Sequence, residues 1–136
     1  MPPNSAFSNK MSSSPRILIV DDSNTIREII RMVVETIGCE VVAEGESGEE
    51  AITLFGEHQP DITLMDIEMP GMGGIRAVTE IIQTHPSAYI LMLSGVDPDI
   101  AMESVFVAGA ADYVKKGDDL ELMIEELQPH IAKFQH

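Results

Sequence analysis

The residues that could take part in a reaction lie at the ends of short apolar runs. Asp21 and Asp22 follow the first run, Asp66 a second and Ser94 a third, and Lys116 follows a fourth. Carboxylates that converge on one point repel one another unless a cation lies among them. An oxygen-rich set with few protein ligands favours Mg²⁺ over Ca²⁺, because positions remain for water and a phosphate. Zinc is not expected, since the histidines are scattered without ligand spacing: His58, His85, His130 and His136.

An aspartate after a strand often has a simpler role as the N-cap of the next helix. Asp21 and Asp22 are followed by Ser23 and Asn24, either of which could cap that helix. Capping alone therefore leaves at least one of the adjacent acids without a structural reason.

The chemistry requires elements that bring these residues together, and the sequence predicts five strands alternating with five helices. Gly38 is the expected stop of the first helix, and Ser47 with Glu50 forms a capping box for the second. The predicted strands are residues 16–20, 40–43, 61–65, 89–93 and 112–114. The predicted helices lie between them and after the last, at about 26–37, 47–55, 75–82, 97–109 and 118–131. Parallel strands need crossover helices, so we expect an α/β fold with a doubly wound parallel sheet covered on both faces.

Length and charge limit the function classes. The 136 residues suit one domain, and we expect a disordered arm at 1–14 before an ordered domain at 15–136. The net charge of -15 argues against direct nucleic-acid binding. Cys39 is the single cysteine, and there is no leader or long apolar run. We therefore expect a cytoplasmic protein without membrane insertion.

Four short motifs in order resemble the receiver domain of bacterial response regulators, the family of the single-domain chemotaxis regulator. ILIVDDS resembles the first strand with its acidic pair, LMDIEMPGMGG the phosphoacceptor strand and loop, LMLSG the switch strand, and GAADYVKK the strand with an aromatic residue and a lysine. The resemblance covers residues 16 to about 134, and the spacings between the motifs agree with it. It implies the flavodoxin-like strand order 2-1-3-4-5 in a three-layer α/β/α fold.

The resemblance also implies a two-component phosphorelay role for individual residues. Asp66 would form an aspartyl phosphate, and Mg²⁺ would be held by Asp22 directly, Asp21 through water, Asp66 and the backbone carbonyl of Glu68. A lysine and the metal would neutralise the phosphoryl oxygens. The resemblance implies that the lysine is Lys116, because it lies three positions after Tyr113 and its neighbour Lys115 would face the other side of the strand.

Two further residues would change position in response to the phosphoryl group. Ser94 would donate a hydrogen bond to it, and Tyr113 would then turn into the space that the serine loop vacates. Each has a plainer reading, as a strand-end serine bonded to water and as a half-buried tyrosine. The family usually has proline after the lysine, in a cis peptide bond, whereas this chain has Gly117, the residue most able to adopt an unusual backbone conformation.

The expected output is a changed surface on the fourth helix, fifth strand and fifth helix. The fourth helix has apolar residues on more than one face: Met102, Val105, Phe106 and Val107. This pattern suggests a surface for a protein partner or for a homodimer formed on phosphorylation. The alternative is a helix that is half-buried under a neighbouring element. No residues after Phe134 are left for an output domain, so we expect a signal carried by protein contacts, although a piece of a longer protein would look the same. The phosphodonor would be a sensor histidine kinase or a histidine phosphotransfer protein.

Two alternatives belong to other classes. A phosphorylation-independent receiver-like scaffold would usually lack an acid or the lysine, and all are present here. A phosphatase of the haloacid dehalogenase type would place its nucleophile on the first strand, two residues before a second aspartate, whereas Asp21 and Asp22 are adjacent. We therefore expect a signalling protein and not an enzyme, one that catalyses only its own phosphotransfer and dephosphorylation.

Overall fold

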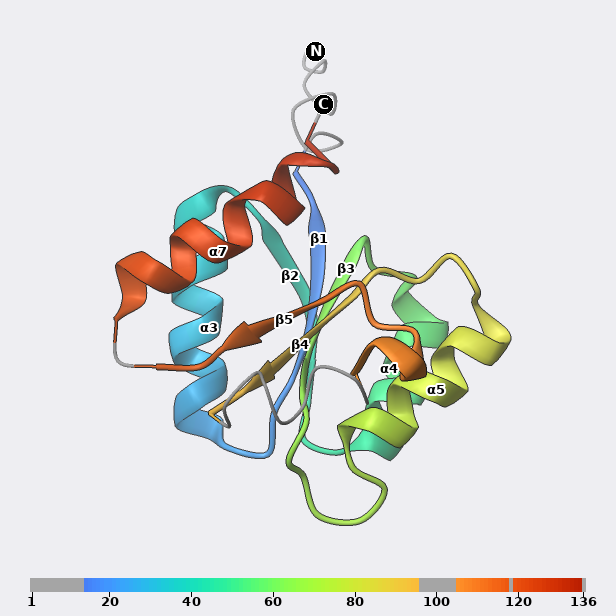
Figure 1. Cartoon of the computed structure of the whole chain (residues 1–136). Helices are drawn as coiled ribbons and strands as arrows, with labels where there is room; N and C mark the ends of the chain where they lie inside the picture. The colour runs from blue at the N-terminus through green and yellow to red at the C-terminus, as the bar shows by residue number, and fades with distance from the viewer. Residues whose placement is uncertain (1–13, 96–104, 118, 136) are drawn as a thin grey trace.

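The computed structural model describes residues 14–95, 105–117 and 119–135. Its centre is one parallel sheet of five strands in the order β2-β1-β3-β4-β5 (Figure 1). The strands are β1 (Arg16–Val20), β2 (Glu40–Gly45), β3 (Ile62–Asp66), β4 (Ile90–Ser94) and β5 (Asp112–Lys115). The doubly wound sheet and the strand order expected from the sequence are therefore confirmed.

Helices cover both faces of the sheet. The helices with described bounds are α3 (Asn24–Ile37), α4 (Gly48–His58), α5 (Gly74–Thr84) and α7 (Leu120–Ala132). Residues 105–108 are helical too, which makes five helical segments among the described residues. Figure 1 shows α3 and α7 on one side of the sheet and α4 and α5 on the other. None of the helices in the described ranges is long and apolar enough to cross a membrane.

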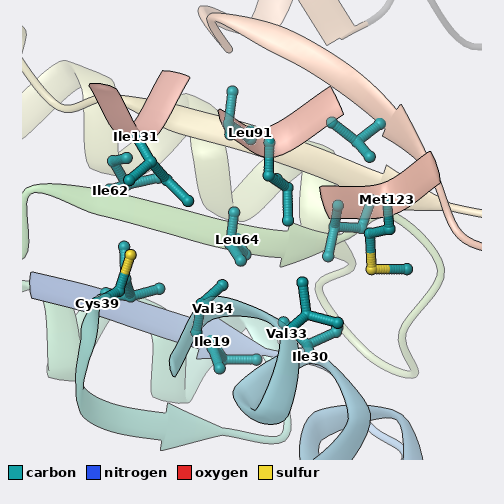
Figure 2. Close-up of a cluster of buried hydrophobic side chains, with 14 residues drawn as sticks. Ile19, Ile30, Val33, Val34, Cys39, Ile62, Leu64, Leu91, Met123 and Ile131 are labelled. Atoms are coloured by element: carbon teal, nitrogen blue, oxygen red, sulfur yellow. The ribbon is translucent and has the colours of Figure 1, made fainter. Parts of the chain in front are cut away.

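Two apolar clusters fill the spaces between the sheet and its helix layers. The cluster under α3 and α7 includes Ile19, Leu64, Val34 and Leu127, all essentially without solvent exposure (Figure 2 shows this cluster). The cluster on the other face lies under α4, α5 and residues 105–108. Because β1, β3 and β4 are buried on both faces, they do not alternate between apolar and polar residues; buried Thr63 is the one polar residue within the run of β3 before Asp66.

Local signals that were read from the sequence set several element ends. Gly38 ends α3 with φ 105°, a left-handed conformation that glycine adopts without strain. Ser23 caps α3 by accepting from the N–H of Ile26, so neither aspartate of the acidic pair is its N-cap. Ser47 caps α4 by accepting from the N–H of Glu50. The Glu50 carboxylate accepts from the N–H of Glu46, one residue earlier than a capping box requires.

Some expectations fall outside the described residues or need adjustment. The predicted arm at 1–14 lies outside them apart from Ser14, as do Met102 and the start of the helix expected at 97. The second strand continues two residues beyond the predicted end, to Gly45. The last helix begins at Leu120 with Asp119 as its cap. No cis peptide bond occurs in the described ranges, so the Lys116–Gly117 bond is trans.

Candidate functional site

The acidic residues meet at the carboxyl edge of the two central strands. Asp66 is the last residue of β3, and Asp21 directly follows β1, where Val20 is paired with Met65. One carboxylate oxygen each from Asp21, Asp22 and Asp66 lies within 4.8 Å of the others. Asp21 and Asp66 are almost fully buried, whereas Asp22 is exposed. The cluster therefore opens to solvent on the side of Asp22.

Lys116 supplies the positive charge of the cluster. Its Nζ lies 3.0 Å from Asp21 Oδ2 and 3.2 Å from Asp66 Oδ1. β5 ends at Lys115, which is exposed, so the two lysines diverge at the end of the strand. The structure thus brings Lys116, and not Lys115, to the acids.

The electrostatics of the cluster favour a bound cation. Burial raises the pKa of Asp66 above its ordinary value, the charge of Asp21 raises it further, and Lys116 opposes both. Burial lowers the pKa of Lys116, but its hydrogen bond to Asp21 and the charges of Asp66 and Asp21 outweigh burial and raise it overall. One lysine therefore does not fully offset the cost of ionising Asp66 beside Asp21.

The loop after β3 positions a second group of polar residues. The N–H of Glu68 donates to Asp66 Oδ1 at 3.2 Å, and the Glu68 carboxylate accepts from Ser94 Oγ at 3.0 Å. Ser94 is fully buried at the end of β4. The resemblance implies a role for Glu68 only through its backbone carbonyl, and its side-chain contact with Ser94 has no sequence signal.

Tyr113 lies inside the fold in this structure. It is 8% exposed, and its hydroxyl donates to the backbone carbonyl of Ser94 at 3.5 Å. The expected inward turn of Tyr113 compares two states of the protein and so stays a prediction. On the helical segment before β5, Val105 is buried while Phe106 and Val107 are 49% and 82% exposed.

Gly74 is a further site residue, and the sequence pattern does not predict its role. A Cβ added at Gly74 would lie 2.0 Å from the backbone oxygen of Asp66, so only glycine permits α5 to begin this close to the end of β3. Its N–H also donates to the Ile67 carbonyl at 3.0 Å. The three glycines after Pro70 marked a loop in the sequence, but this close approach is a tertiary contact.

The donor set fits Mg²⁺ on chemical grounds. It consists of carboxylate oxygens, with the carbonyl of Glu68 in the same loop, and it includes no thiolate or imidazole. The exposed side of the cluster leaves room for the waters that Mg²⁺ retains. The fold and site together define a doubly wound α/β protein with an acidic cluster, paired with one lysine, at the carboxyl edge of its sheet.

Comparisons with known proteins agree with that class. The model of the response regulator receiver domain matches residues 17–128. Chemotaxis protein CheY of Bacillus subtilis is 39% identical over 112 residues, which are 82% of this chain and 93% of CheY. Response regulator GacA of Pseudomonas viridiflava is 35% identical over 114 residues, 83% of this chain and 53% of GacA. The chain belongs to the response regulator receiver domain family.

Solved structures give the same result. A two-component response regulator of the LuxR family from Aurantimonas sp. SI85-9A1 superimposes with a TM-score of 0.82 at 35% identity, covering 90% of this chain and 89% of that one. The CheX-CheY-BeF3-Mg²⁺ complex from Borrelia burgdorferi gives 0.79 at 26% identity, with 89% and 90% covered. The chain spans about half the length of the GacA proteins and almost the whole length of CheY.

Proposed function

We propose that residues 15–136 form a receiver domain that accepts a phosphoryl group on Asp66 in a Mg²⁺-dependent reaction in the cytoplasm. The observation that carries this proposal is the placement of Asp66 at a strand end, buried beside Asp21 and in contact with Lys116. Membership of the receiver family adds to it and leaves the dehalogenase-type phosphatase without support.

The contacts of Asp66 indicate which of its oxygens reacts. Oδ1 accepts from Lys116 Nζ and from the N–H of Glu68. Among the described residues, none donates a hydrogen bond to Oδ2. We assign Oδ2 as the oxygen that attacks phosphorus in line, forming the P–O bond to Asp66 while the donor's phosphorus bond breaks.

The other site residues would bind and orient the incoming group. Asp22, Asp21, Asp66 and the Glu68 carbonyl would hold Mg²⁺, which neutralises charge on the phosphoryl oxygens. Lys116 would form an ion pair with one of those oxygens. The CheY of the Borrelia complex, with BeF3 and Mg²⁺, supports a site of this kind.

Ser94 would take part only after it changes partner. Its hydroxyl now donates to Glu68, so it must release that carboxylate to donate to a phosphoryl oxygen. We expect this exchange to move the serine loop and Tyr113, and to alter the surface formed by the helix of residues 105–108, β5 and α7. A protein target or a second copy of the chain would bind that surface.

The donor and target are proposed as classes. A sensor histidine kinase or a histidine phosphotransfer protein would supply the phosphoryl group, and the signal would pass to a protein partner. The net charge of -15 argues against direct nucleic-acid binding by this domain. The chain would act as a signalling protein and turn over only its own phosphoryl group.

A small phosphodonor such as acetyl phosphate tests the proposal. With Mg²⁺, the intact protein should gain one acid-stable, base-labile phosphoryl group by mass spectrometry, and chelation should prevent the gain. Asp66→Asn should abolish it. Asp61→Asn is the matched control, because Asp61 lies at the opposite end of β3 and its carboxylate accepts from the N–H of Arg16. No mass gain in the wild type would favour the phosphorylation-independent scaffold, and steady release of phosphate from phosphomonoesters would revive the phosphatase.

A further inference from the structure

Arg27 is a buried cation beside the acidic pair that has no part in the proposed phosphotransfer. It lies on α3 and is 7% exposed, although arginine is rarely buried without partners. Its Nη1 donates to the backbone carbonyl of Asp21 at 2.6 Å, and its Nη2 donates to Asn24 Oδ1 at 2.9 Å. The guanidinium thus connects α3 to the chain segment that leaves β1.

The charge of Arg27 is offset by acids from β2 and the loop after it. Nε lies 3.3 Å from Glu44 Oε1, and Nη1 lies 3.9 Å from Glu46 Oε1. Nε makes no hydrogen bond, so the contact with Glu44 is an ion pair without hydrogen-bond geometry. Arg31 pairs with the same Glu44, whereas the arginine hydrogen bond to Asp21 comes from Arg27.

The carbonyl that Arg27 holds belongs to the peptide unit that joins the two acids. This unit is planar, so fixing the Asp21 carbonyl also fixes where the N–H and Cα of Asp22 lie. The N–H of Asp21 donates to the Gly45 carbonyl at 3.1 Å, which holds the other side of the residue. Asp22 is exposed and lies outside the sheet, so the guanidinium contact orients it from the buried side.

We infer that Arg27, held by Glu44, is a positioning residue for the Asp21–Asp22 pair and that it sets the affinity of this pair for a divalent cation. The inference rests on the proposed metal site. A preorganised pair of ligands loses less conformational freedom on binding, and partners behind metal ligands typically change metal affinity about 10- to 100-fold. The net charge of the chain would remain strongly acidic without Arg27.

Replacing Arg27 distinguishes positioning from simple electrostatics, because the two predict opposite changes in the affinity for Mg²⁺. A buried positive charge repels Mg²⁺, so electrostatics alone predicts that Arg27→Met binds Mg²⁺ more tightly. Positioning predicts weaker binding. Arg31→Met is the matched control, because it removes the same charge and a partner of the same glutamate but leaves the Asp21 carbonyl untouched.

The experiment is a calorimetric titration of the full chain with Mg²⁺, and with Mn²⁺ as a spectroscopic probe, alongside thermal unfolding in a chelator. We expect about a tenfold loss of affinity for Arg27→Met and no loss for Arg31→Met. Arg27→Lys keeps the charge but cannot reach both the Asp21 carbonyl and Asn24, so it should lose less Mg²⁺ affinity than Arg27→Met. This variant also tests the inference if Arg27→Met does not fold. Unchanged or tighter binding by a folded Arg27 variant would overturn the inference. Absence of binding by the wild type would instead overturn the proposed metal site, and the inference with it.

Discussion

Lys116 forms ion pairs with two buried aspartates from different strands. Its Nζ lies 3.0 Å from Asp21 Oδ2 and 3.2 Å from Asp66 Oδ1. The lysine follows β5 at one side of the sheet, while the aspartates follow or end the two central strands. One flexible side chain therefore links three strands at the point where the phosphoryl group is proposed to bind.

Lys116→Met should destabilise the metal-free protein and prevent its phosphorylation. The substitution leaves two buried carboxylates facing each other, and breaking a buried ion pair costs about 3 kcal/mol. Denaturant unfolding in a chelator measures the loss. Lys115→Met removes an exposed charge one position earlier and should change stability by no more than about 0.5 kcal/mol. Equal effects of the two substitutions would contradict the assignment of Lys116.

Asp66→Asn should stabilise the metal-free protein at neutral pH. The pKa of Asp66 is raised in the folded protein, so the native state holds its proton to higher pH than the unfolded chain does. Wild-type stability therefore falls as pH rises from the unfolded value near 3.8 through the raised native value, and the variant escapes this loss. Thermal midpoints of both proteins in a chelator should coincide in acid and separate towards neutral pH. Mg²⁺ should then stabilise the wild type only, and a variant that is less stable at neutral pH without metal would refute this account.

Gly74→Ala should destabilise the fold and distort Asp66 together. The added Cβ would overlap the Asp66 carbonyl, and such overpacking costs about 3 kcal/mol or more. Gly56→Ala is the control, because Gly56 lies inside α4 with nothing within 4 Å of an added Cβ. That control should gain about 0.5 to 1 kcal/mol from helix propensity. Denaturant unfolding measures both, and a neutral result for Gly74→Ala would contradict the described contact.

Tyr89→Phe should lower stability without affecting phosphorylation. The Tyr89 hydroxyl lies 2.6 Å from His130 Nδ1 and accepts from Lys133 Nζ at 3.1 Å, and His130 Nε2 lies 3.0 Å from Asp112 Oδ2. This network links α7 to the amino ends of β4 and β5, the opposite edge from Asp66. The loss should be about 1 kcal/mol in denaturant unfolding. Reduced phosphodonor labelling of the folded variant would show that the two edges are coupled after all.

Cys39 should resist alkylation in the native protein. Burial raises the pKa of its thiol to about 11, so the reactive thiolate is scarce at neutral pH. Labelling with iodoacetamide should be slow in buffer and fast in denaturant. Because the unfolded thiol ionises near 9.0, stability should also fall as pH rises from there towards 11. Equal labelling rates with and without denaturant would contradict the described burial.

The parts that the sequence predicted well depend on local signals. The continuous apolar run from Ile17 to Val20 indicates a strand buried on both faces, and Gly38 and Ser47 mark helix ends through their own backbone and side chains. The extension of β2 to Gly45 was missed because its last residues are polar and lie on an edge strand. Local patterning gives no information about such a boundary.

The predicted site residues gather in one place, but contacts between distant residues had no sequence signal. Arg27 has the sequence pattern of an ordinary helix residue, and its contacts with the Asp21 carbonyl and with Glu44 on β2 depend on how distant segments pack. Tyr89 and His130 lie 41 positions apart, so a list of scattered histidines could not pair them. Strand alternation and the spacing from Tyr113 in the family pattern both favour Lys116 over Lys115, and Lys116 is the lysine that reaches the acids.

Chemical trapping of the phosphoryl linkage tests the central claim most directly. After incubation with acetyl phosphate and Mg²⁺, borohydride reduces an aspartyl phosphate to homoserine, which peptide mass spectrometry can locate. The account predicts homoserine at position 66 alone, and none when a chelator replaces Mg²⁺. Homoserine at Asp21, Asp22 or another aspartate, or none at any position after labelling, would contradict it.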